Sequence, residues 1–191
     1  MKGLSLVRLT IFIWLIIISS IVLFVVLYLD NEHINEGNKQ IEEDAEMPDG
    51  LHPEVEAKRD ELLQRAEEKG IEVIITEGFR TLERQDELYE QGRTTEGDIV
   101  TYAQGGESYH NYGLAIDFAL INQDGNITWN TSYDGNNNEK SDWVEVAEIG
   151  KDLGFEWGGD WNRFKDYPHL QMDFGLSIHE LQNGKRPDID E

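Results

Sequence analysis

The chain has 191 residues and a formal net charge of −23, from 16 basic and 39 acidic side chains. Such an acidic surface repels nucleic acid, so no nucleic-acid partner is expected. The absence of cysteine excludes a disulfide scaffold and thiolate metal ligands. Beyond the first fifty residues the chain is long enough for one domain with a single core, which we expect to be monomeric.

An uncharged apolar run occupies residues 9–29 and follows a positively charged segment, 1–8. At about 1.5 Å per residue, this run would span roughly 30 Å as a helix, which is the thickness of one hydrocarbon core. The charges predict a cytoplasmic N-terminus, one transmembrane anchor and an extracytoplasmic remainder. A cleavable signal peptide is the alternative, with Ser19 and Ser20 as the small residues at its cleavage site. Residues 30–50 are polar and acidic, as in a tether.

A folded domain is expected over residues 51–173. Pro53 suits the first position of a helix and Gly70 suits its end, and apolar residues recur between them at helical spacing. Residues 71–76 (Ile-Glu-Val-Ile-Ile-Thr) are predicted to form a strand, with Val73 and Ile75 on the opposite face from Ile74. After the turn that follows, Thr81 can cap a second helix.

The most informative segment covers residues 108–120, Ser-Tyr-His-Asn-Tyr-Gly-Leu-Ala-Ile-Asp-Phe-Ala-Leu. From Leu114 onward it alternates as a strand does, with one apolar face. The other face carries Asp117 between two alanines, and their small side chains leave space for the partner that such a charge needs. His110 lies seven residues earlier and His169 lies 52 residues later. Two imidazoles and a carboxylate are the protein ligands of a catalytic zinc site; the alternative is a buried aspartate paired with a core histidine.

These motifs resemble those of the bacterial zinc peptidases that cut peptidoglycan stem peptides. Ser-x-His-x-x-Gly-x-Ala-x-Asp, beginning at Ser108, and Asp-x-x-His, ending at His169, are similar to the motifs of the D-Ala-D-Ala carboxypeptidases. Residues 78–85 (Gly-Phe-Arg-Thr-x-x-x-Gln) and 157–161 (Trp-Gly-Gly-Asp-Trp) narrow the resemblance to the L-alanyl-D-glutamate endopeptidases of bacteria and phage endolysins. The resemblance covers residues 50–172. It implies an α+β fold, with a small antiparallel sheet and flanking helices.

The resemblance also implies a catalytic centre. One Zn²⁺ would be held by His110, Asp117 and His169. Asp166 would be the general base, which accepts a proton from water and later returns it to the leaving amine. Without the resemblance, Asp166 would be interpreted as a turn residue.

Four further residues correspond to substrate-binding positions of the family. Arg80 and Gln85 would bind the carboxylate of D-glutamate, because a planar guanidinium suits two-point recognition of a carboxylate. Ser108 and Trp161 would contact substrate in the cleft. From the residues alone, Arg80 could equally pair with a surface glutamate, Ser108 could cap the turn that follows it, and Trp161 could be a core residue.

An Asn-rich segment over residues 134–145 has oxygen-bearing side chains close to the spacing of a calcium-binding loop, and a helical pattern follows it. The segment departs from the loop pattern at its sixth position, where Glu139 replaces glycine. A turn that caps the following helix is the alternative, and any bound calcium would be structural. The candidate ligands are Asp134, Asn136, Asn138, Asp142 and Glu145.

The expected function is zinc-dependent hydrolysis of the L-Ala–D-Glu bond in peptidoglycan by an enzyme anchored in the bacterial membrane and facing the wall. Three alternatives stay open. They are a D-Ala-D-Ala carboxypeptidase on the same scaffold, a zinc-containing wall-binding module without catalysis, and a purely structural membrane-anchored domain. Residues 174–191 lie outside the resemblance and are expected to form a polar tail.

Overall fold

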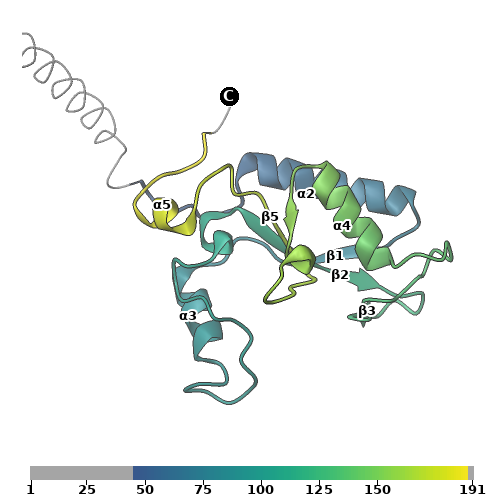
Figure 1. Ribbon diagram of the computed structural model, residues 1–191, viewed down its shortest axis with the longest axis horizontal. Helices are drawn as coiled ribbons and strands as arrows, with labels where there is room; N and C mark the ends of the chain where they lie inside the picture. Colours follow the sequence, from purple (N-terminus) through teal and green to yellow (C-terminus); the bar gives the residue numbers. More distant parts are fainter. Residues whose placement is uncertain (1–44, 189–191) are drawn as a thin grey trace, which may run out of the picture. The chain divides into compact units, whose positions relative to one another are not determined.

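The computed structural model describes residues 45–188 (Figure 1). Helices are combined with an antiparallel sheet, as expected for an α+β domain. The elements are α2 (Pro53–Glu68), β1 (Val73–Glu77), α3 (Leu82–Glu90), the 3₁₀ helix η1 (Tyr109–Tyr112), β2 (Ala115–Ile121), β3 (Ile127–Thr128), α4 (Asp142–Asp152), β4 (Glu156–Trp157), the 3₁₀ helix η2 (Gly158–Asp160), β5 (His169–Gln171) and α5 (Ile178–Gln182).

One five-stranded antiparallel sheet has the order β1-β2-β5-β4, and β3 pairs with the end of β2. The central strand is β2, as the alternation of residues 114–120 predicts. Its register places Asp117 opposite Glu77 of β1 on one side and opposite His169 of β5 on the other. Because paired residues project to the same face of a sheet, β2 gathers polar side chains from both neighbouring strands.

The opposite face of the sheet carries the hydrophobic core. Figure 1 shows α2 and α4 close together along the sheet, with α3 and its following loop apart from them. Ile116, Phe118 and Leu120 of β2 are fully buried and belong to the same core cluster as Leu62 of α2 and Trp143 of α4. The predicted division of β2 into an apolar face and a face that carries Asp117 is therefore confirmed.

The expected membrane anchor requires correction. In the part of the chain that the structure describes, no helix is both long enough and apolar enough to cross a bilayer. The run over 9–29 lies outside the described residues. The structure therefore gives no support to the expected N-terminal transmembrane helix or to a single-pass membrane location.

The tail expected over 174–191 is packed in its described part. Ser177 and Glu180 form a reciprocal capping box that starts α5. Leu181 is 1% exposed and joins the core cluster, and Arg186 donates a hydrogen bond to its backbone oxygen. The segment therefore extends the domain, because one buried leucine and a capped helix hold it in place.

Candidate metal centre and cleft

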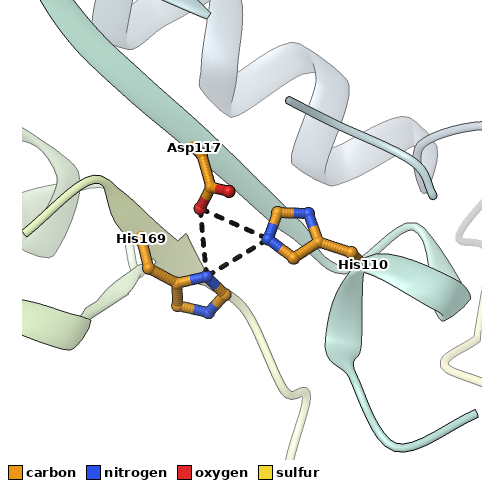
Figure 2. A group of neighbouring side chains, drawn as sticks. All are labelled: His110, Asp117 and His169. Atoms are coloured by element: carbon orange, nitrogen blue, oxygen red, sulfur yellow. Dashed lines mark hydrogen bonds and ion pairs between the residues drawn. The ribbon is translucent and has the colours of Figure 1, made fainter. Parts of the chain in front are cut away.

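Three potential metal ligands meet on the polar face of the sheet (Figure 2). His110 comes from η1, Asp117 from β2 and His169 from β5. The Oδ1 atom of Asp117 lies 3.3 Å from Nε2 of His110 and 3.2 Å from Nδ1 of His169, and the two nitrogens are 3.2 Å apart. A tetrahedron with metal–ligand bonds of about 2.0 Å has edges of about 3.3 Å. The triangle thus has the dimensions of one face of a zinc coordination sphere.

The backbone around His110 is fixed on both sides of the 3₁₀ turn. Ser108 caps the turn, since its hydroxyl accepts a hydrogen bond from the His110 N–H. Gly113 ends the turn in the left-handed region, at a φ of 69°, and a side chain there would collide with the backbone oxygen of Gly50. The His110 backbone oxygen also accepts the N–H of Arg80. The motif spacing Ser-x-His-x-x-Gly therefore encodes a capped and sharply ended turn that presents the imidazole.

The hydrogen bond on the far side of His110 determines which of its ring nitrogens is free. Nδ1 lies 2.7 Å from the backbone oxygen of Gly78, which can only accept. Nδ1 therefore carries the hydrogen, and Nε2 presents a lone pair to Asp117 and His169. Lone pairs that converge on a carboxylate repel one another unless a cation lies between them. The donor set fits a divalent metal such as zinc better than it fits the buried ion pair considered from the sequence.

Asp117 and His169 shift each other's pKa values. Burial alone would raise the pKa of Asp117, but the adjacent His110 and His169 imidazoles hold it well below its usual range. Burial lowers the pKa of His169, yet the hydrogen bond and charge of Asp117 outweigh burial and raise it. In the metal-free protein the cluster therefore favours an ionised carboxylate beside a protonated imidazole, so protons compete with metal for the site.

Asp166 lies on the turn that leads into β5, and its side chain lines the same cleft. Its N–H donates to the backbone oxygen of Gly158, and its own backbone oxygen accepts from the His169 N–H. Burial raises the pKa of the Asp166 carboxyl, and the charge of Asp117 adds to this increase, while His169 and Arg80 act against it. A carboxyl whose pKa moves toward neutrality suits transfer of protons in both directions.

The three ligands open into a cleft of about 660 Å³. Trp161 forms one wall, with its ring centroid 5.2 Å from that of His169. At the rim, Tyr102 and Phe164 face each other edge to face with centroids 6.5 Å apart and are 73% and 53% exposed. Exposed aromatic rings beside a polar centre are typical of a cleft that binds an extended ligand.

Arg80 and Gln85 differ in their access to this cleft. Arg80 lines it, with Nη2 3.5 Å from Oδ2 of Asp117 and Nη1 donating to Gln85 over 2.9 Å. Gln85 is fully buried, and its amide group donates to the backbone oxygen of Ala103. The side chain of Gln85 thus holds Arg80 and the following loop, and its expected contact with substrate stays a prediction. Ser108 lines the cleft in addition to capping the turn.

The calcium prediction is not supported, because protein donors occupy the side chains of the loop. Glu145 is 3% exposed and accepts hydrogen bonds from Lys69, Asn136 and Asn138. The two asparagines thus turn their N–H groups toward Glu145, whereas a calcium site needs their oxygens. Asp134 accepts backbone N–H groups at 138 and 139, and Asp142 accepts that of Gly135. Among the described residues, the group of side chains that could hold a metal ion is His110, Asp117 and His169.

Gln171 is a site residue that the motifs do not mark. It follows His169 by two positions on β5 and so projects to the same face, where its amide oxygen lies 3.0 Å from Nε2 of His169. Strand alternation was the signal that could have found it. The other unmarked group is the backbone oxygen of Gly78, for which side-chain patterns carry no signal.

Comparison with known proteins gives consistent results. A family model described as D-alanyl-D-alanine carboxypeptidase matches residues 101–172. The chain is 66% identical over 130 residues to the peptidoglycan L-alanyl-D-glutamate endopeptidase CwlK of Bacillus subtilis, which covers 68% of this chain and 78% of that protein. It is 38% identical over 113 residues to the L-alanyl-D-glutamate peptidase of Listeria phage A118, over 59% of this chain and 34% of the phage protein. A solved L-Ala D-Glu endopeptidase of Serratia marcescens is similar with a TM-score of 0.46 and 24% identity, over 70% of this chain and 85% of that one.

Proposed function

Because this chain belongs to the peptidoglycan L-alanyl-D-glutamate endopeptidases, a family of zinc peptidases, we propose that it cuts stem peptides with a zinc ion held by His110, Asp117 and His169. The observation that carries this assignment is the triangle of ligand atoms, each 3.2 or 3.3 Å from the others. Its edges match a tetrahedral zinc site, which leaves a fourth position open toward the cleft.

Zinc bound there would supply a Lewis acid that lowers the pKa of water and polarises the scissile carbonyl. The chain itself supplies the proton transfers. Asp166 lines the cleft and takes a proton from the attacking water, then returns it to the amine of the departing D-glutamate. The raised pKa of its carboxyl, caused first by burial, favours the return step.

Arg80 is proposed to bind the α-carboxylate of D-glutamate in the substrate. D-Glutamate that is linked through its side chain keeps a free α-carboxylate close to the scissile bond, and a guanidinium can bind it at two points. Gln85 holds Nη1, while the buried Nε of Arg80 has no hydrogen-bond partner among the described residues. Ser108 and Trp161 line the same cleft and are proposed to contact the peptide. All these residues come from one chain, so we infer that a monomer suffices.

The test is digestion of a synthetic stem peptide, L-Ala–γ-D-Glu–L-Lys–D-Ala-D-Ala, by the purified full-length chain, with mass analysis of the products. Release of L-alanine supports the proposal. Loss of only the terminal D-alanine would assign a D-Ala-D-Ala carboxypeptidase instead. A chain that binds one zinc and cuts neither bond would be the non-catalytic module. The matched control is His169→Ala, which should bind no zinc and cut nothing.

A further inference from the structure

A hydrogen-bonded chain leads from His169 to a carboxylate on the edge of the sheet. Nε2 of His169 lies 3.0 Å from Oε1 of Gln171, and Nε2 of Gln171 lies 3.2 Å from Oε2 of Glu156. Glu156 and Gln171 are register partners on β4 and β5, so both side chains project to the face that bears the metal ligands. Gln171 is 7% exposed, whereas Glu156 is exposed to solvent.

The charge of Glu156 decides how the amide between them is oriented. A carboxylate can only accept hydrogen bonds, so Gln171 must turn its NH₂ group toward Glu156. Its oxygen then faces His169 and can only accept as well. When its ring is neutral, as metal binding requires, His169 must therefore carry its single hydrogen on Nε2. This leaves the lone pair on Nδ1, the atom 3.2 Å from Asp117 Oδ1. Each step follows from donor and acceptor chemistry, and the first step is fixed outside the metal centre.

We propose that Glu156 is a positioning residue of the metal centre, which acts through the Gln171 amide to keep His169 in the tautomer that can bind zinc at Nδ1. This inference rests on the proposed zinc site. Glu156 is not a ligand, and its own contact in the relay is with Gln171. Gly78 serves the same purpose for His110, where a backbone oxygen replaces the amide. Each histidine thus directs a ring lone pair toward Asp117. A backbone oxygen orients His110, and a side-chain amide orients His169.

Reversing the charge of Glu156 tests the relay. In Glu156→Lys the new ammonium can only donate, so it draws the oxygen of Gln171 outward and turns the NH₂ group toward His169. The hydrogen of His169 then moves to Nδ1, and zinc affinity should fall about 10- to 100-fold, the usual effect of losing such a partner. Affinity is measured on the full-length chain by competition with a chromophoric chelator. The far-ultraviolet circular dichroism and melting temperature of the metal-free variant show that it is folded.

The matched control for charge alone is Asp173→Lys. The pKa of Tyr109 is raised first by burial and then by the negative charges of Asp173 and Glu156. Both carboxylates therefore lie close enough to Tyr109 to act on it, in the same part of the domain. The Asp173 carboxylate accepts a hydrogen bond from the N–H of Gly175, whereas Glu156 accepts one from Gln171. Comparison at about 0.05 M and 0.5 M salt separates the two effects, since salt screens a distant charge but leaves an amide orientation unchanged. The Glu156→Lys loss should persist at high salt, and the smaller Asp173→Lys loss should shrink.

A second substitution should rescue the first. In Glu156→Lys/Gln171→Glu the new carboxylate accepts from both the lysine and Nε2–H of His169, so the working tautomer returns and zinc affinity should recover to within a few-fold of the wild type. Long-range ¹H–¹⁵N NMR of the zinc-loaded wild type should show the His169 hydrogen on Nε2. A hydrogen on Nδ1, Glu156→Lys affinity equal to that of Asp173→Lys, or absence of rescue would each overturn the relay. A wild type that binds no zinc would overturn the metal site itself.

Discussion

Asp117 and His169 are register partners on β2 and β5, and their ligand atoms Oδ1 and Nδ1 lie 3.2 Å apart. Paired residues of antiparallel strands share a face, so one strand pairing brings together two of the three proposed metal ligands. His110 completes the set from the turn just before β2. The proposed metal centre therefore depends on strand register, because a shift of β5 by one residue would turn His169 away from it.

Removal of the carboxylate should remove the metal. Asp117→Ala leaves two histidines, so we expect less than one tenth of the wild-type zinc content after dialysis, and loss of peptide cleavage. In the wild type, free zinc at about 1,000 times its dissociation constant should stabilise the fold by about 4 kcal/mol, and a chelator should reverse this. Metal analysis and thermal melting measure both effects. Asp124→Ala, on the exposed hairpin, is the control, and full zinc in Asp117→Ala would refute the ligand assignment.

Asp166→Asn should separate proton transfer from metal binding. The amide keeps nearly the same shape but cannot take up the proton, so kcat should fall roughly 10²- to 10⁴-fold. Zinc content and KM should stay near their wild-type values, because Asp166 is not one of the three clustered ligands. Steady-state kinetics with metal analysis measure this. Loss of zinc from the variant would move Asp166 into the metal shell.

Arg80→Ala should weaken cleavage selectively. With the free α-carboxylate on D-glutamate we expect kcat/KM to fall by roughly 10- to 150-fold, as for loss of a charged hydrogen-bonded pair worth about 1.5–3 kcal/mol. With the amidated substrate the wild type should be slower and the penalty of the substitution smaller. Arg84→Ala, whose guanidinium pairs with Glu87 on the exposed side of α3, is the control. An equal penalty on both substrates would show that Arg80 supports the site without reading the carboxylate.

Gly158→Ala should disturb the turn that carries Asp166. A Cβ atom at Gly158 would lie 2.5 Å from the backbone oxygen of Asp166 and 3.2 Å from Cβ of His169, so the turn must move away from the sheet. We expect a lower melting temperature and a loss of activity of tenfold or more, measured on the zinc-loaded chain. Gly50→Ala is the control, since its Cβ would meet no atom within 4 Å. Unchanged activity in Gly158→Ala would show that the turn tolerates displacement.

Glu145 should make the stability of the Asn-rich loop dependent on pH. Burial raises the pKa of Glu145, but Asn136, Asn138 and Lys69 outweigh it and lower the pKa below its usual value. A carboxyl with a depressed pKa stabilises the fold above its unfolded pKa, and this contribution is lost as the pH falls through the folded pKa. Glu145→Gln should therefore cost about 1–3 kcal/mol at pH 7 and much less at pH 3. Denaturant unfolding at both values, with the exposed Glu148→Gln as control, tests this; a cost independent of pH would contradict it.

The sequence alone determined the local parts of this protein. The alternation of residues 114–120 assigned the apolar face of β2 and the face that carries Asp117, and both assignments hold. Pro53 and Thr81 marked the starts of α2 and α3. The motifs around His110 and His169 predicted the cluster that these histidines form with Asp117, and they identified the enzyme family. These features are readable because a period of two, a cap or a sharp turn is set by neighbouring residues.

Only the tertiary structure decided what depends on distant segments. It buried Gln85 beneath the loop that follows α3, because burial depends on residues distant in the sequence. It turned the amides of Asn136 and Asn138 toward Glu145 and so removed the calcium site, because a spacing pattern does not say whether oxygens or N–H groups point inward. It also joined Glu156 to His169 through Gln171. Strand register makes that link, and register is a property of the whole sheet that no single segment specifies.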